Sequence, residues 1–367
     1  MTVSMIGSRG LPEQAGGVER VLEAVCVRLV ESGRAGVTVY CANWLEHDDE
    51  EYRGVRLRRV RGPETKYGDT LVRSMLATFR EMFRGSDVVH YHSIGSAPLA
   101  LLPRLTGKKV VVTVHALDWQ RAKWNGLATK LLQFGEWAAV RFPHETIAVG
   151  QEIKEYLEER YDSEVTYIPN GAEKRVHVDP SPLIEDHGLR PGAYALFVGR
   201  LVPEKGVHLL VEAIRQLPDL DAQVALVGPD WYELEYTAKL KEMIGDDERI
   251  KLVGTAGDEL LAQLYSGCAV FVLPSDVEGM SLSMLDALAY GNAIVTSSIP
   301  PNRNLVGDAA VVFEAGNVDA LRDALEEVFT QKGRMCELRK LAVERSKDYD
   351  WDGISAQWAD VYDRLVD

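Results

Sequence analysis

The sequence is poor in cysteine and contains no long apolar run. Its four cysteines, Cys26, Cys41, Cys268 and Cys336, lie far apart and form no CxxC or Cys/His ligand pattern. We therefore expect reduced core thiols, and neither a disulfide framework nor a metal site. No stretch approaches the ~20 apolar residues that a membrane helix needs, and the first ten residues lack the basic flank of a signal peptide. These absences predict a cytoplasmic protein.

Positive charge is scarce in the second half of the chain. Residues 173–367 hold 34 acidic and 19 basic residues, whereas residues 1–172 hold 22 of each. A protein that binds nucleic acid usually carries a basic surface, so we expect no nucleic-acid partner. The exception is a basic segment at 53–84. Its nine cations are Arg53, Arg56, Arg58, Arg59, Arg61, Lys66, Arg73, Arg80 and Arg84, against the acids Glu64, Asp69 and Glu81.

What the chain does contain is a regular alternation of short apolar strands and amphipathic helical stretches. Its 367 residues, 46% hydrophobic and 26% charged, suit a globular protein of two domains. In the first half the predicted strands are 3–6, 37–41, 88–92, 109–114 and 146–149, and the predicted helices are 18–31, 71–83 and 127–140. This alternation predicts a parallel sheet covered on both faces.

The alternation begins again after a polar segment at 173–192. Here the predicted strands are 195–198, 222–227, 250–253, 269–274 and 293–297, and the predicted helices are 207–215, 234–244, 258–266 and 281–290. A last amphipathic stripe at 351–365 predicts a closing helix. We therefore expect an α/β protein with two doubly wound, Rossmann-like domains that face each other across a cleft.

Ligands of open α/β sheets bind beyond the carboxyl ends of the strands, so the loops after strands are the informative ones. After the first strand, Gly16 and Gly17 precede a predicted helix. Paired glycines there let backbone amides and the helix dipole approach a phosphate, although a tight turn is an alternative interpretation. The glycine spacing differs from GxGxxG, which disfavours a nicotinamide dinucleotide site and hence a dehydrogenase.

The first loop of the second half carries two cations, Arg200 and Lys205, between glycines. A guanidinium fork and an ammonium point charge five residues apart suit a clamp for a diphosphate. The alternative is a pair of surface cations near Glu204.

A second loop, Leu273-Pro-Ser-Asp-Val-Glu-Gly-Met-Ser-Leu282, places Glu278 and Gly279 before a predicted helix that carries Asp286. Helix-start amides favour a phosphate, and the carboxylates could bind sugar and ribose hydroxyls. A solvated helix with acids near its start is the alternative.

Histidines end two strands of the first half. His115 follows the strand 109–114, and His90 and His92 end the strand 88–92. Each could bind a sugar hydroxyl or be a satisfied structural histidine. Free backbone groups at Val253, Gly254 and Thr255 could contact a base, and we find no Asp-x-Asp metal motif at a strand end.

These motifs, in their order and spacing, resemble the retaining GT-B glycosyltransferases of the fourth glycosyltransferase sequence family (glycosyl transferases group 1). The similarity extends from Gly16-Gly17-Val18-Glu19 through His115 and 199–206 to 273–291 and the last helix. Residues 7–19 are especially similar to the rhamnosyltransferase-like branch. The family's Glu, seven residues, Glu motif reads Glu278 to Asp286 here, with a shorter second acid. Met280-Ser281 replaces the commoner Phe-Gly, and Asn304 stands where many members have an acid.

The resemblance implies donor binding by 173–350, acceptor binding by 1–172, and a helix at 351–367 that crosses back to the N-terminal domain. It implies a role for each site residue. The donor diphosphate is contacted by Gly17, Arg200, Lys205 and the amides of Ser281 and Leu282, the sugar by His115, Glu278, Gly279 and Met280, the ribose by Asp286, and the base by 253–255. It also implies retention of configuration and no metal ion.

The predicted activity is therefore transfer of a hexose-type sugar from a UDP-sugar, or secondly from GDP-mannose, to a glycan, lipid-linked or small-molecule hydroxyl. A sugar-nucleotide epimerase and a non-catalytic nucleotide-sugar-binding protein remain alternatives. The basic segment 53–84, with apolar residues interleaved, could also contact an anionic membrane at its inner face; an ordinary amphipathic helix is the other interpretation.

Overall fold

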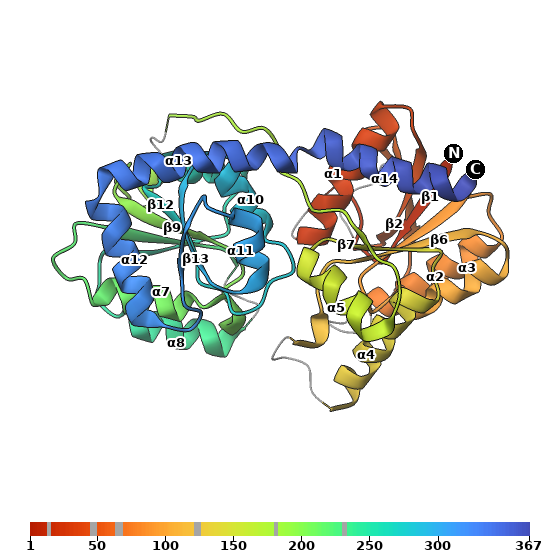
Figure 1. The fold of residues 1–367 in the computed structure, drawn as a ribbon, viewed down its shortest axis with the longest axis horizontal. Helices are drawn as coiled ribbons and strands as arrows, with labels where there is room; N and C mark the ends of the chain where they lie inside the picture. The colour runs from red at the N-terminus through yellow and green to blue at the C-terminus, as the bar shows by residue number, and fades with distance from the viewer. Residues whose placement is uncertain (13–15, 45–49, 63–68, 121–125, 180–182, 230–232) are drawn as a thin grey trace. The chain divides into compact units, whose positions relative to one another are not determined.

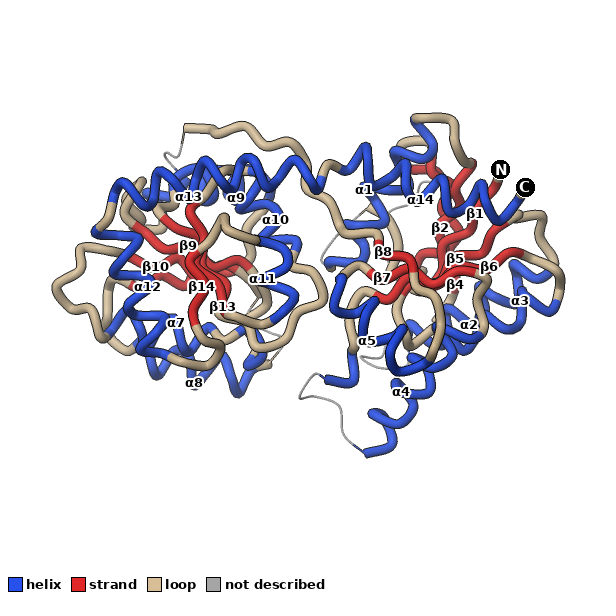
Figure 2. The backbone as a smooth tube through the Cα atoms, viewed as in Figure 1, coloured by secondary structure: helices blue, strands red, loops and turns tan. Residues whose placement is uncertain are grey.

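A computed structural model describes residues 1–12, 16–44, 50–62, 69–120, 126–179, 183–229 and 233–367. The chain divides into two compact units. The N-terminal unit comprises Met1–Gly171 together with Trp351–Asp367, and the C-terminal unit comprises Ala172–Asp350. Each unit is a sheet with helices on both faces (Figures 1 and 2), as the alternating sequence pattern predicts.

The N-terminal unit is built on a sheet in the order β3-β4-β2-β1-β5-β6-β7-β8, in which only the edge pair β3 and β4 is antiparallel. The strands are β1 Thr2–Ile6, β2 Gly36–Ala42, β3 Glu51–Tyr52, β4 Val55–Val60, β5 Val88–His92, β6 Lys109–Val114, β7 Glu145–Ala148 and β8 Thr166–Tyr167. The helices are α1 Gly17–Glu31, α2 Asp69–Met82, α3 Leu101–Leu105, α4 Gly126–Arg141, α5 Gln151–Tyr161 and α14 Trp351–Val366, with short 3-10 turns at Ala97–Ala100 and Asp118–Gln120.

The last helix, α14, belongs to the N-terminal unit although it follows the whole C-terminal unit in the sequence. Its apolar stripe is buried and includes Trp358 at 1% exposure and Tyr362 at 0%. It packs against α1, and Arg28 of α1 binds Asp352 with a nitrogen–oxygen distance of 2.8 Å. The predicted return of the final helix to the N-terminal domain is therefore confirmed.

The C-terminal unit has an all-parallel sheet in the order β11-β10-β9-β12-β13-β14. The strands are β9 Tyr194–Val198, β10 Gln223–Val227, β11 Ile250–Gly254, β12 Val270–Leu273, β13 Ala293–Ser297 and β14 Val311–Phe313. The helices are α6 Leu183–Asp186, α7 Val207–Arg215, α8 Leu234–Ile244, α9 Asp258–Gly267, α10 Leu282–Ala289, α11 Pro300–Val306, α12 Val318–Thr330 and α13 Lys332–Ser346, with 3-10 turns at Pro203–Lys205 and Lys347–Tyr349.

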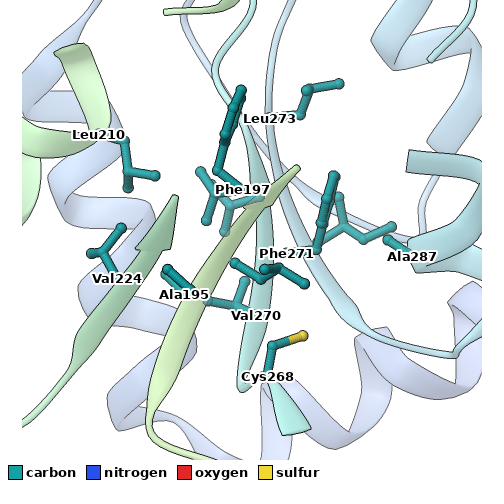
Figure 3. Close-up of a cluster of buried hydrophobic side chains, with 14 of the residues drawn as sticks. Ala195, Phe197, Leu210, Val224, Cys268, Val270, Phe271, Leu273 and Ala287 are labelled. Carbon is teal, nitrogen blue, oxygen red and sulfur yellow. The ribbon is translucent and has the colours of Figure 1, made fainter. Parts of the chain in front are cut away.

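Two neighbouring strands in the core of the C-terminal unit position the loops 199–206 and 274–281, which contain candidate site residues. Phe197 of β9 and Phe271 of β12 are fully buried in the hydrophobic cluster of this unit (Figure 3). Since β9 and β12 are parallel neighbours, their carboxyl ends reach the same edge of the sheet. The loops 199–206 and 274–281, which follow these strands, therefore begin side by side.

Three of the four cysteines are buried as predicted, but Cys336 on α13 is exposed, so its assignment to the core was wrong. Cys26 lies among apolar neighbours of α1, and burial raises the pKa of its thiol far above the ordinary value. The exposed Cys336 lies in a helix of largely polar residues, whose sequence gives no clear apolar stripe.

Candidate functional site

The two site loops of the C-terminal unit are joined by close backbone contacts. The Asp276 N–H donates to the Glu204 carbonyl at 2.9 Å. Gly206 has φ +65°, and a Cβ at this residue would lie 2.1 Å from the Pro274 oxygen. Only glycine allows this approach together with that backbone conformation. Main-chain contacts thus hold the two loops together.

The side chains of Lys205 and Glu278 meet across these loops. Their Nζ and Oε1 atoms lie 2.5 Å apart, with 15% of the lysine side chain and 8% of the glutamate side chain exposed. The sequence interpretation placed Lys205 on a diphosphate and Glu278 on a sugar, but gave no contact between them. The structure brings the two predicted residues together in one partly buried ion pair.

Gly199, directly before Arg200, is held against the end of β10. The Gly199 N–H donates to Val227 at 2.9 Å, and a Cβ on Gly228, whose φ is +149°, would lie 1.8 Å from the Gly199 oxygen. The close contact between Gly228 and Gly199 therefore brings the end of β10 against the start of the loop 199–206. Arg200 itself is half-buried, and its contact with a diphosphate stays a prediction.

The start of α10 is capped by Ser281, whose hydroxyl accepts from the Met284 N–H at 3.3 Å. The first amides of any helix lack a carbonyl one turn earlier, so those of Leu282 and Ser283 face the space before the helix. Gly279 and Met280 are half-buried in the segment between Glu278 and this helix start. The arrangement suits an anion at the helix N-terminus.

Asp286 is buried on α10, with 5% of the residue exposed, and its carboxylate accepts from Arg175 at 3.1 Å. The guanidinium of Arg175 also lies 5.7 Å from the centre of the Tyr290 ring. Nothing in the sequence marked Arg175, which lies in the polar segment 173–192. The ribose contact predicted for Asp286 remains a prediction, and a ribose would meet a carboxylate that is already paired with a cation.

Val253, Gly254 and Thr255 lie at the end of β11. Gly254 has φ +79°, and its carbonyl accepts from the Gly228 N–H at 2.8 Å. Val253 is half-buried and Thr255 is exposed. Gly228 thus connects this strand end to the Arg200 loop, and the contact with a base stays a prediction.

In the N-terminal unit, His115 follows β6 and lies beside the two histidines of β5. Nδ1 of His92 is 3.2 Å from Nε2 of His115. Burial lowers the pKa of His115 to about 4 and holds those of His90 and His92 well below the ordinary value. All three rings are therefore neutral near pH 7, and His115 can act as a hydrogen-bond partner but not as a cation.

The end of β1 makes a close contact beneath these histidines. Gly7 has φ +110°, and a Cβ there would lie 2.4 Å from the His92 carbonyl oxygen. Ser93, directly after β5, has φ +77°, a conformation that is uncommon for serine. Such outliers are frequent at functional sites, so this strand end is a candidate site on backbone grounds as well.

Gly16 and Gly17 begin α1 as expected, and Gly16 has an extended φ of 174°. Glu19, in the first turn, accepts from the Arg9 N–H at 2.8 Å and so joins the loop after β1 to the helix. The intervening residues 13–15 lie outside the described part of the chain. A phosphate contact from Gly17 therefore stays a prediction.

The arginines of the basic segment 53–84 differ in exposure. Arg73 is 4% exposed and donates to the Ser8 carbonyl at 2.9 Å, so its assignment to an open basic surface was wrong. Arg80 and Arg84 are exposed beside apolar side chains of α2. Glu64 and Lys66 lie outside the described residues, as do the side-chain surroundings of Asp69.

Over the described ranges, no cluster of three or more His, Cys, Asp or Glu side chains is placed to bind a metal ion. Among the helices that the structure describes, none is both long and apolar enough to cross a membrane.

Two glycosyltransferase family models match the chain, one in each half. Residues 184–348 match the family model described as Glycosyl transferases group 1, and residues 15–175 match the one described as Glycosyltransferase Family 4. O-antigen chain mannosyltransferase B of Escherichia coli is 27% identical over 211 residues, 54% of this chain, and the match spans about half (52%) of that relative's length. The GDP-mannose-dependent alpha-(1-6)-phosphatidylinositol monomannoside mannosyltransferase of Mycolicibacterium smegmatis is 26% identical over 90% of each chain.

Solved structures show the same fold. Sucrose-phosphate synthase from Thermosynechococcus elongatus superposes with a TM-score of 0.86 at 21% identity, covering 99% of this chain and 98% of that one. HepE of Anabaena, in complex with UDP-glucose, has a TM-score of 0.79 at 18% identity and covers 99% of both chains. The predicted GT-B architecture of two Rossmann-like domains is thereby confirmed.

Proposed function

Since the chain belongs to the glycosyltransferases of group 1 and family 4, we propose that it moves a hexose-type sugar from a UDP- or GDP-linked donor to an acceptor hydroxyl, with retention of configuration. The observation that carries this proposal is the ion pair of Lys205 and Glu278 beside the capped start of α10. It places a cation, a carboxylate and helix amides within two joined loops, which is what a sugar diphosphate needs.

Departure of the diphosphate is the difficult step of such a transfer, because negative charge develops on it as the glycosidic bond breaks. Arg200, Lys205 and the amides of Ser281 and Leu282 would stabilise that charge without reorganising. The departing phosphate oxygen would accept the proton of the acceptor hydroxyl, which attacks from the same face of the sugar. No enzyme carboxylate serves as nucleophile in this proposal, and no metal ion is required.

The remaining site residues would position the donor. Glu278 and the amides of Gly279 and Met280 would bind sugar hydroxyls, and His115 would contact the sugar near the acceptor. Asp286 would bind the ribose, and residues 253–255 the base. Residues 173–350 would thus bind the donor, while residues 1–172 with 351–367 would bind a glycan, lipid-linked or small-molecule acceptor.

A UDP-sugar is the first choice of donor and GDP-mannose the second. HepE, with the same fold, was crystallised with UDP-glucose, and the Mycolicibacterium relative is named for its dependence on GDP-mannose. A direct test is a thermal-shift series with UDP-glucose, UDP-galactose, GDP-mannose and their nucleotides. A donor at 100 times its dissociation constant stabilises the native state by about 2.7 kcal/mol.

The series is followed by product analysis with candidate acceptors, with and without EDTA. A glycoside whose anomeric configuration matches that of the donor, formed equally in EDTA, is the expected result. An altered sugar nucleotide formed without acceptor would identify an epimerase, and stabilisation without turnover would identify a binding protein. An inverted glycoside would contradict the proposed mechanism.

We further propose that α2 contacts an anionic membrane, where a lipid-linked acceptor would lie. Its outer face exposes Leu71, Met75, Leu76, Phe79 and, just after the helix, Phe83, which is 86% exposed. Arg80 and Arg84 flank this apolar face. Apolar side chains that insert and cations that attract anionic lipid together favour binding at a membrane surface.

Replacing Phe79 and Phe83 by serine is expected to reduce binding to phosphatidylglycerol vesicles at least ten-fold, because each buried aromatic ring is worth about 1.5–3 kcal/mol. Sedimentation with vesicles measures this effect. Leu234→Ser, at a site 72% exposed on α8 of the C-terminal unit, is the matched control and should bind like the unaltered chain. Equal binding of both variants, or equal binding to uncharged phosphatidylcholine, would contradict the membrane proposal.

A further inference from the structure

The rings of His92 and His115 meet at one pair of nitrogen atoms. Nδ1 of His92 lies 3.2 Å from Nε2 of His115. His92 is fully buried, with 0% exposure. Its other ring nitrogen, Nε2, is also buried and has no hydrogen-bond partner among the residues that the structure describes. The imidazole of His92 is therefore directed by a single polar contact, and that contact is His115.

Stacking holds the His92 ring in place. Its centre lies 4.4 Å from that of His90, and 5.8 Å from that of Trp358 on α14, whose plane is tilted by only 11°. His90 is in turn held at both nitrogens, by the Tyr362 hydroxyl at 2.7 Å and by the Thr113 hydroxyl at 2.8 Å. A series of contacting rings, the histidine column, thus extends from Trp358 of α14 through His90 and His92 of β5 to His115.

We propose that His92 is a positioning residue that fixes the tautomer of His115, so that His115 presents Nδ1–H as a hydrogen-bond donor. Nε2 of His92 is buried and has no hydrogen-bond partner among the described residues. A neutral imidazole carries one proton, and a buried N–H without an acceptor is rarer than a buried acceptor without a donor. The proton of His92 therefore resides on Nδ1 and is donated to Nε2 of His115.

His115 then has a lone pair at Nε2, and its own proton must be at Nδ1. Burial supports the neutral state of both rings, because it lowers the pKa of His115 to about 4 and that of His92 well below its ordinary value. Under the proposed function, on which this step rests, the Nδ1–H of His115 would donate to an oxygen of the sugar or acceptor. The opposite tautomer would offer only a lone pair there.

The tautomer is measurable in the free protein by long-range proton–nitrogen NMR of chains labelled with ¹⁵N-histidine. We expect His115 to be the Nδ1–H form in the unaltered chain. In His92→Phe, which keeps an aromatic ring but removes both nitrogens, the Nε2–H form of His115 should predominate. If the Nδ1–H form falls to about 1–10% of the molecules, kcat should fall in proportion, about 10- to 100-fold, with a smaller change in the donor KM.

Two amide variants separate positioning from packing. Asn places its amide where Nδ1 of His92 lies, so His92→Asn should keep the His115 tautomer and recover kcat to within a few-fold. Gln places its amide near Nε2, so His92→Gln should not. Thr113→Val, which removes a partner of His90 only, should lower the melting temperature and leave the tautomer unchanged.

An unchanged His115 tautomer in His92→Phe and His92→Gln would overturn the proposal, as would a loss of kcat in His92→Asn equal to that in His92→Gln. Because the NMR measurement needs no substrate, it decides the role of His92 even if the chain transfers no sugar. In that event the proposed function fails, and the tautomer result stands by itself.

Discussion

Lys205→Ala is expected to lower transferase turnover about 10²- to 10³-fold, because a preorganised cation on a leaving group contributes about that factor. In the structure the Lys205 side chain is 15% exposed and its ammonium nitrogen lies 2.5 Å from Glu278, so its position is set before a donor arrives. Initial rates of glycoside formation measure the loss. Lys239→Ala is the matched control, since Lys239 is an exposed lysine of α8 paired with Glu235, and it should keep normal turnover.

Loss of Lys205 also leaves the Glu278 carboxylate without its cation, and this second effect must be separated from catalysis. A poorly solvated carboxylate destabilises the native state, so the melting temperature of Lys205→Ala should fall by about 5 °C. Adding Glu278→Gln removes the negative charge. We expect the double variant to recover the melting temperature but not the turnover.

The two possible failures of this prediction have different meanings. Near-normal turnover of Lys205→Ala would remove Lys205 from the diphosphate clamp. Recovery of turnover in the double variant would show that Lys205 only neutralises Glu278. Binding of UDP or GDP, followed by thermal shift, adds an independent readout, because the clamp requires that Lys205→Ala weaken nucleotide-diphosphate binding in proportion to the lost contact.

The buried parallel strands could be predicted from the sequence because they are short runs rich in apolar and β-branched residues. The predicted strands 88–92, 109–114 and 293–297 match β5, β6 and β13 without any shift at their ends. Such strands are covered on both faces, so most of their side chains are apolar, although β5 also buries His90 and His92. The loops after them could then be assigned to the site edge of the sheet.

The strand β4 was missed for the opposite physical reason. Its sequence, Val55-Arg-Leu-Arg-Arg-Val60, is buried only at Val55, Leu57 and Val60. The exposed positions carry arginine, and we interpreted the segment as a basic patch and not as a strand near the sheet edge. A strand with one solvated face alternates in polarity, and its charge content alone does not distinguish it from a surface loop.

Site pairings were less predictable than site residues. Lys205 and Glu278 are 73 residues apart, and their contact depends on the neighbouring positions of β9 and β12, which local pattern does not specify. Arg175 could not be found at all, because an arginine in a polar segment has no spacing that points to Asp286. His92 was noticed at a strand end, but its contact with His115 arises from the pairing of β5 with β6.

Acidification from pH 7.5 to 5.0 is expected to destabilise the N-terminal unit through His90 and His92, by at most about 4 kcal/mol for the two residues together. Both are fully buried, and burial holds their pKa values well below the ordinary 6.5. Below pH 6.5 the unfolded chain binds protons at these residues and the folded chain does not, so stability present above pH 6.5 is lost as the pH falls. A residue that stays neutral in the folded state contributes about 1.4 kcal/mol per pH unit below 6.5, which amounts to at most about 2 kcal/mol at pH 5.0.

Urea unfolding, followed by hydrogen–deuterium exchange of peptides from β5 and β6, measures this loss in the N-terminal unit itself. His92→Asn removes one of the two groups while retaining a polar contact to His115, so its loss of stability between pH 7.5 and 5.0 should be smaller, by at most about 2 kcal/mol. His187→Gln, at a half-buried site of the C-terminal unit, should keep the full effect. If the unaltered chain and His92→Asn lost stability equally, the histidine column would be protonated in the folded state, and the neutral imidazoles on which the assigned tautomer of His115 depends would be excluded.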